Sequence, residues 1–170
     1  MDILVEPAGF LYWNDSNGVP RKARCALGPA GIGQKKTEGD GITPIGRFPL
    51  RRVMFRSDRM SAPQTALPVS PLGKADGWCD DPTSPQYNKP ITLPHPASHE
   101  LLWREDAVYD VIIEIGFNDR PVEPGKGSAV FMHVARPDYG PTQGCVALKL
   151  NDLLDLLKAC DLETVLEISQ

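Results

Sequence analysis

Short apolar candidate strands, separated by turn residues, recur along the chain and predict strands joined by turns. The 17 prolines and 15 glycines are spread over most of the 170 residues, and this density favours short strands over long helices. Tyr109–Ile115 is the strongest strand candidate, because it is rich in β-branched residues and precedes a turn signal. We expect it to pair with Ser128–Val134. Other strands are predicted at Arg24–Leu27, Arg47–Val53, Val146–Leu150 and Thr164–Ile168.

A single segment near the C-terminus has the spacing of an amphipathic helix. Asn151–Ala159 reads NDLLDLLKA, with leucines at helical intervals. Asn151 is a favourable N-cap residue. Asp152 suits the positive end of the helix dipole and Lys158 suits the negative end. The sequence therefore predicts one short helix after the last loop.

The segment Ser57–Ser98 shows little periodicity and is rich in proline. Segments of this length without regular structure are usually functional or disordered. Its aromatic residues favour an ordered loop that packs on the rest of the protein. Trp78, Tyr87 and Asn88 either form the wall of a pocket or serve only in packing.

Composition and charge narrow the function classes. The length suits a single domain, residues 1–170, with one core. A net charge of -4 gives no basic face for nucleic acid. No apolar run approaches the roughly 20 residues of a membrane span. The N-terminus lacks the basic segment of a secretory signal, and its apolar run is interrupted. We therefore expect a cytoplasmic protein, or a periplasmic one if the N-terminus was trimmed.

The four cysteines show no CxxC pair, and a reducing cytosol keeps thiols free, so we expect no disulfide. Cys160 ends the apolar helical pattern and is interpreted as a small buried residue. Cys145 differs, because it lies 145 − 133 = 12 positions after His133 in FMHVARPDYGPTQGCVAL. A hairpin-like return of the chain would bring the two side chains together.

A cysteine beside a histidine is a candidate nucleophile with its base, since a base within hydrogen-bond reach activates the thiol. Gly144 precedes the cysteine and allows a tight turn whose N–H groups point inward, where they can stabilise an oxyanion. Two other readings stay open. Cys145 and His133 are separate structural residues, or they belong to a zinc site. Zinc is disfavoured because Pro96 separates His95 from His99 and Cys79 is distant.

The same stretch resembles the active-site region of the L,D-transpeptidase catalytic domain family, the YkuD type. That family has a histidine, a loop, and then Ser/Thr-His-Gly-Cys followed shortly by an arginine; His133, Thr142, Gly144 and Cys145 match it. Upstream, GDGITPIGRFPL (Gly39–Leu50) resembles the family's GDG-x-TP-x-G-x-F segment. The segment Ile115–His133 is also similar to it.

The resemblance implies a mainly β, β-sandwich-like domain with long loops and one short C-terminal helix. It implies a cysteine enzyme that acts on the L,D bond between a diamino acid and D-alanine in peptidoglycan stem peptides. Cys145 would be the nucleophile and His133 the base. The Gly144 and Cys145 amides would be oxyanion donors, and a backbone carbonyl would orient the histidine. No cofactor or metal is expected, and the partner would be a stem peptide or a free murein tetrapeptide.

Two positions depart from the family pattern. Gln143 stands where the family has histidine, and Ala147 stands where it usually has arginine. Arg136 is therefore a candidate to bind a peptide carboxylate, although a plain surface role also fits. Thr142 and Gln143 are further candidates for substrate binding.

The fate of the acyl-enzyme separates two activities. Attack by water would make an L,D-carboxypeptidase of murein recycling, which the expected cytoplasmic location favours. Attack by an amine would make an L,D-transpeptidase that forms 3-3 cross-links or exchanges D-amino acids. From another class, the Gln143 and Ala147 departures also suit a peptide-binding module without catalysis. The sequence does not indicate the oligomeric state.

Overall fold

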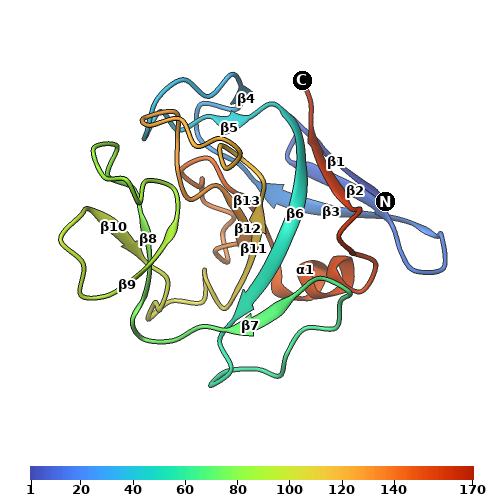
Figure 1. Ribbon diagram of the computed structural model, residues 1–170. Helices are drawn as coiled ribbons and strands as arrows, with labels where there is room; N and C mark the ends of the chain where they lie inside the picture. Colours follow the sequence, from blue (N-terminus) through green and yellow to red (C-terminus); the bar gives the residue numbers. More distant parts are fainter.

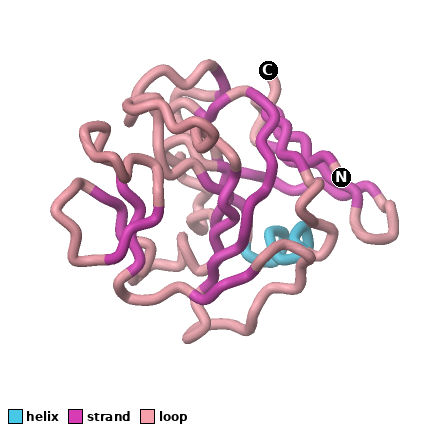
Figure 2. Tube along the Cα trace, viewed as in Figure 1, coloured by secondary structure: helices cyan, strands magenta, loops and turns pink.

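The structure is a computed structural model that describes residues 1–170. It consists of 14 short strands and one helix (Figures 1 and 2). The elements in chain order are β1 (Asp2–Glu6), β2 (Phe10–Asn14), β3 (Pro20–Ala26), β4 (Ile32–Gly33), β5 (Thr43–Pro44), β6 (Gly46–Phe55), β7 (Val69–Pro71), β8 (Asp76–Cys79), β9 (Pro90–Thr92), β10 (His99–Leu101), β11 (Val111–Ile115), β12 (Phe131–Val134), β13 (Val146–Leu148), α1 (Leu150–Leu157) and β14 (Val165–Ile168).

Nine strands form the body in the order β11-β12-β13-β3-β2-β1-β14-β6-β7. The long strand β6 also pairs with β11, so the order closes on itself. Its first residues, Gly46–Pro49, pair with β14, and Leu50–Phe55 pair with β11. Strand β6 pairs with β14 and β11, and β3 pairs with β2 and β13. These pairings bring the strands around one main core. This confirms the expected mainly β, sandwich-like fold.

Alternation along the strands explains the core. In β1 and β2 every second residue is buried: Ile3 and Val5, then Leu11 and Trp13. This period of two is the signature of a strand with one face on a core. These two strands were not among the predicted ones, although their alternation was present in the sequence.

The helix lies where the sequence predicted it, but it starts earlier than expected. It begins at Leu150, and the capping position is occupied by Lys149, whose side chain makes no cap hydrogen bond. The expectation that Asn151 caps the helix was wrong, because the chain passes from β13 into α1 within one residue. Burial of Leu153, Leu156 and Leu157 sets the helix register, each contributing about 1.5–3 kcal/mol.

Two other predicted strands start later than expected, whereas β3 starts before Arg24 and β6 extends beyond Arg47–Val53 at both ends. The strand expected from Tyr109 begins at Val111, and the one expected from Ser128 begins at Phe131. The two pair antiparallel, as expected. Before β12, Gly127 and Ala129 adopt positive φ angles of 118° and 51°, which extended strand does not allow.

The proline-rich segment is ordered and contains its own strands. β8 pairs with β9 and β10 in a small three-stranded sheet beside the main body (Figure 1). Trp78 of β8 packs edge-on against Phe131 of β12, with ring centroids 4.9 Å apart. The small sheet therefore covers the outer face of β12.

Close backbone contact joins two loops at Gly28. Its N–H donates to the buried Thr43 hydroxyl at 2.9 Å. A Cβ at this position would lie 2.1 Å from the Gly41 carbonyl oxygen and 3.2 Å from the Gly144 Cα. The loop that follows β3 thus rests directly against the loop that carries Cys145.

We predict that Gly28→Ala lowers the free energy of unfolding by more than about 2 kcal/mol, because backbone atoms must move to admit the methyl group. Gly33→Ala is the matched control, since its Cβ would meet only side-chain atoms, at 3.8 and 3.9 Å. The control should change the free energy by less than about 1 kcal/mol. Urea unfolding measures both; equal stability of the two variants would contradict the prediction.

Candidate active site

Strand β12 divides its side chains between two clusters. Met132 and Val134 point into the main core, while Phe131 points to a second buried cluster on the opposite face. His133 shares the face of Phe131, because successive strand residues alternate. The ring of Tyr109 packs edge-on against both Phe131 and His133.

Strand β13 lies parallel to β12, with His133 opposite Ala147 and Met132 opposite Val146. The expected hairpin-like return was therefore wrong: the loop is a crossover that starts β13 beside the start of β12. Parallel neighbours require such a connection. The register brings Cys145 to Phe131, whose N–H donates to the cysteine Sγ at 3.3 Å.

The Cys145 thiol is buried and has two backbone partners. Besides the Phe131 N–H, its S–H donates to the Ala129 carbonyl oxygen at 3.2 Å. Ala129 holds this oxygen in place with a left-handed φ of 51°, a conformation that costs a non-glycine residue of order 1 kcal/mol. The sulfur position is therefore set by the segment before β12.

His133 is 6% exposed, and its Nδ1 lies 3.0 Å from the Val134 carbonyl oxygen. A carbonyl oxygen only accepts, so Nδ1 carries the proton and Nε2 keeps a lone pair. No hydrogen bond uses Nε2. The expectation that a backbone carbonyl orients the histidine is confirmed.

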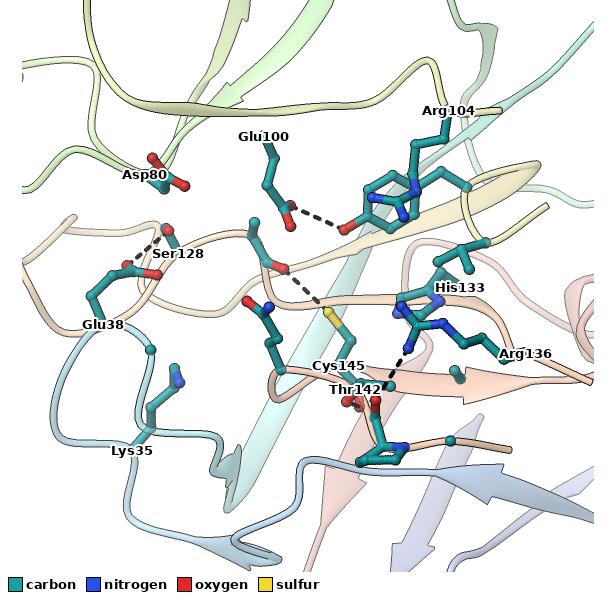
Figure 3. A pocket seen from close by; sticks show the side chains of 18 residues that line it. Lys35, Glu38, Asp80, Glu100, Arg104, Ser128, His133, Arg136, Thr142 and Cys145 are labelled. Carbon is teal, nitrogen blue, oxygen red and sulfur yellow. Dashed lines mark hydrogen bonds between the residues drawn. The ribbon is translucent and has the colours of Figure 1, made fainter. Parts of the chain in front are cut away.

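Cys145 and His133 line one cavity of about 210 Å³ (Figure 3). The cavity brings together residues from distant parts of the chain: Lys35, Glu38, Asp80, Glu100, Arg104, Tyr109, Ser128, Ala129, Arg136, Thr142, Gln143 and Ala147 also line it. No hydrogen bond joins Cys145 to His133, since the S–H is turned to Ala129.

Burial makes both groups neutral in the resting state. It lowers the pKa of His133 to about 4, with smaller contributions from the charges of Arg136 and Arg104. It raises the pKa of the Cys145 thiol to about 12, although the Phe131 N–H acts in the opposite direction. Desolvation disfavours whichever form is charged. A thiol and a neutral imidazole therefore face the cavity at pH 7.

The loop before the nucleophile is held by Thr142. Its buried hydroxyl donates to the Cys145 carbonyl oxygen at 2.7 Å and accepts the Gly144 N–H at 3.1 Å. The Thr142 side chain is therefore hydrogen-bonded within the loop. The Gly144 N–H, one of the two expected oxyanion donors, is bonded to it. The Cys145 N–H makes no hydrogen bond. Gln143 is exposed at the cavity, and its side chain makes no hydrogen bond.

Gly144 has a φ of 126°, which favours glycine. A Cβ here would meet the Ile42 carbonyl oxygen at 2.7 Å. Glycine is thus required both by the turn and by the neighbouring loop. That loop is part of the GDGITPIG segment, so the two motifs recognised in the sequence touch at this point.

Ala147 is buried beside His133 and leaves space where the family pattern has arginine. Two arginines reach the same cavity from other segments. Arg104 is paired with Asp106 at 2.6 Å, whereas Arg136 makes only a 3.4 Å hydrogen bond, to the Pro141 carbonyl oxygen. Arg136 therefore has a cationic group available to a ligand.

Trp78, Tyr87 and Asn88 are buried and do not line the cavity, so they do not form its wall. Asn88 uses its whole amide: Oδ1 accepts from the Trp78 indole and the Ala129 N–H, and Nδ2 donates to the Phe117 and Asn118 carbonyl oxygens. Its bond to Ala129 supports the residue that holds the thiol. Asn88 is a positioning residue behind the site.

Sequence reasoning missed the acidic side of the cavity, formed by Glu38, Asp80 and Glu100. These carboxylates come from three separate loops and strands, and no local motif marks them. Across the chain, no three His, Cys, Asp or Glu side chains converge as metal ligands would. All four cysteines are free and buried.

Comparison with solved structures gives the helical cell shape determining protein Pgp2 from Campylobacter jejuni, at 15% identity and a TM-score of 0.49. A mutant of the same protein matches at 17% identity and a TM-score of 0.46. Each match covers 99% of this chain but 47% and 46% of the other, so the chain spans about half their length. No curated protein matches.

A family model described as the L,D-transpeptidase catalytic domain, YkuD, matches residues 2–168. The match includes both motifs that suggested the resemblance. No helix in the structure is long and apolar enough to cross a membrane. The chain therefore belongs to the L,D-transpeptidase catalytic domain (YkuD) family of cysteine-dependent peptidoglycan enzymes.

Proposed function

We propose that this protein is a hydrolytic L,D-carboxypeptidase that removes D-alanine from murein tetrapeptides by acyl transfer to Cys145. The observation that carries the proposal is the shared cavity: a buried thiol and a histidine whose Nε2 has a free lone pair face the same small space. A nucleophile and a base in one enclosed pocket suit covalent catalysis.

In the first half-reaction the thiol turns from the Ala129 carbonyl and passes its proton to His133 Nε2. The sulfur attacks the carbonyl carbon of the third residue. Collapse of the tetrahedral intermediate breaks the C–N bond, and the imidazolium gives its proton to the departing D-alanine amine. A thioester to Cys145 remains.

The negative oxygen of that intermediate needs hydrogen-bond donors. The Cys145 N–H is without a partner and is suited to this task. The Gly144 N–H becomes a second donor only if it leaves the Thr142 hydroxyl. In the second half-reaction His133 takes a proton from a water molecule, whose oxygen attacks the thioester carbon. The C–S bond then breaks, the tripeptide leaves as its carboxylic acid, and the imidazolium returns its proton to the Cys145 sulfur.

The size of the cavity supports water as the acceptor. At about 210 Å³ it is smaller than the roughly 300–1,000 Å³ of ordinary ligand pockets. It suits the end of one peptide and leaves little room for a second chain. A role in murein recycling follows from this activity, and the cytoplasmic location expected from the sequence stays a prediction.

Transpeptidation is the second candidate, because the matching family model carries that description. The two differ only in the group that attacks the thioester. A small free D-amino acid could still enter as acceptor, so its effect on the products separates the alternatives.

Incubation with a free tetrapeptide should give tripeptide and D-alanine in the mass spectrum, both with and without added D-methionine. Cys145→Ala should abolish turnover, whereas Cys160→Ala, which removes another buried cysteine, should not. A D-methionine adduct as main product would indicate a transpeptidase. Peptide binding without any cleavage by the unmodified protein would indicate a binding module.

Arg136→Ala should raise KM about tenfold to hundredfold, with a smaller change in kcat, since it removes a charged partner of the peptide carboxylate. A tetrapeptide ending in a carboxamide should bind the unmodified enzyme equally poorly and should not respond to the substitution. Lys74→Ala, at an exposed lysine outside the cavity, is the control. An unchanged KM in Arg136→Ala would remove this residue from the site.

The neutral state of His133 in the resting enzyme should be visible in an NMR titration. The Cε1–Hε1 resonance of His133, assigned by its loss in His133→Gln, should titrate near pH 4 rather than 6.5, because burial disfavours the imidazolium. The neutral base is then present throughout pH 5–8 and is lost as the pH falls through 4. A midpoint above 6 would instead indicate a thiolate–imidazolium pair.

A further inference from the structure

We propose that Lys35 is a further catalytic residue, whose ammonium group donates a hydrogen bond to the oxyanion of the tetrahedral intermediate. This inference rests on the proposed function, because it needs an acyl-transfer step at Cys145. The carbonyl oxygen becomes negative when the C–S bond forms, and the carbonyl is restored when the C–N bond breaks. The ammonium stabilises the negative stage between these two events and keeps its proton throughout.

The loop that carries Cys145 has only one backbone donor ready for this oxygen. The Cys145 N–H makes no hydrogen bond, whereas the Gly144 N–H is bonded to the Thr142 hydroxyl at 3.1 Å. Sites that stabilise an oxyanion combine several donors that are already in place before the charge develops. A second donor from another segment would therefore complete the site while the loop keeps its resting hydrogen bonds.

Lys35 brings a buried positive charge to this loop. Its side chain is only 3% exposed and lines the cavity, where Figure 3 shows it among the side chains around Cys145. Its Nζ lies 3.6 Å from the point where a Cβ on Gly144 would stand. The ammonium is therefore beside the residue that precedes the nucleophile. Lysine is almost never buried to this extent unless its charge has a partner.

Two of the three N–H donors of this ammonium have no partner. One donates to Asp40 Oδ1 at 2.6 Å, and no other hydrogen bond uses Nζ. Buried donors are normally satisfied in the functioning molecule. The remaining N–H groups are thus available to an oxygen that forms in the cavity.

Asp40 does not need the lysine to satisfy its own carboxylate. That carboxylate also accepts the backbone N–H groups of Lys36, Thr37 and Ile42, at 2.8, 3.2 and 3.0 Å. These three bonds hold the turn of the GDGITPIG segment without any help from Lys35. Asp40 therefore serves to aim the ammonium, and a purely structural role of Lys35 in this turn is disfavoured.

The stem of Lys35 is held by a close approach to Gly127. A Cβ at Gly127 would lie 2.5 Å from Lys35 Cε and 2.9 Å from its Cδ. Only a glycine at this position leaves space for the lysine. Since Asp40 fixes the amine and Gly127 confines the stem, the donor is in place before substrate arrives, as electrostatic catalysis requires.

The positive charge of Lys35 also acts on the nucleophile. Burial dominates the pKa of the Cys145 thiol and raises it, while the charge of Lys35 works to lower it. The oxyanion forms on the carbon that the Cys145 sulfur attacks. A cation that acts on the sulfur therefore also attracts this oxygen, because charges interact strongly over such short distances in a buried site.

The test compares Lys35→Met with Lys36→Met. Methionine keeps a long unbranched stem beside Gly127 but has no ammonium. Lys35→Met should lower kcat for the tetrapeptide about 100-fold to 1,000-fold, the range for loss of one oxyanion donor, with little change in KM. Lys36 is exposed and lies outside the cavity, so Lys36→Met should keep full activity. If Lys35→Met does not fold, Lys35→Gln provides the same comparison.

Two further measurements separate stabilisation of the oxyanion from binding of the substrate. A tripeptide aldehyde forms a tetrahedral adduct with Cys145, and its affinity should fall at least about tenfold in Lys35→Met, as expected for a transition-state analogue. The intact tetrapeptide should bind Cys145→Ala and the double variant Cys145→Ala/Lys35→Met with equal Kd.

The possible failures are distinguishable. An unchanged kcat in Lys35→Met would overturn the inference while the proposed function stands. Weaker tetrapeptide binding by the double variant, or an unchanged affinity for the aldehyde, would also overturn it, because Lys35 would then act in substrate binding or on the thiol alone. No cleavage of the tetrapeptide by the unmodified protein would contradict the proposed function, and the inference with it.

Discussion

The site depends on the two-residue alternation of β12 between two buried clusters. Met132 and Val134 must face the main core, so Phe131 and His133 must face the other way. A shift of one residue would place His133 in the apolar main core and would turn Met132 and Val134 toward the second cluster. The burial that stabilises the sandwich thus also fixes the direction of the histidine, and the parallel register of β13 places Cys145 against the same face.

A strand face directed away from the main core would be open to water if nothing covered it. The small sheet β8–β10 provides the cover through the Trp78 contact with Phe131. Asn88, from the same segment, holds Ala129, and Ala129 holds the thiol. Packing of this segment is therefore what converts an outer strand face into an enclosed pocket, where desolvation keeps both Cys145 and His133 neutral.

Ala147 stands in the pocket where the family pattern has an arginine, and the pocket has its unpaired cation at another position. Ala147 leaves room beside His133, and the free cation is instead on the exposed loop residue Arg136. The opposite side carries carboxylates held by hydroxyl groups.

The sequence by itself determined the fold class, the pairing of the two central strands, the helix and the Cys–His–Gly motif, since alternation, turn residues and short motifs are local signals. It also indicated the family, through two motifs that prove to touch at Gly144 and Ile42. It did not determine the parallel arrangement of β12 and β13 or the helix start, because both follow from which leucines and valines reach the common core. The carboxylates of the cavity, from positions 38, 80 and 100, are brought together only by the tertiary structure, since segments far apart in the chain carry no local mark of the place where they meet.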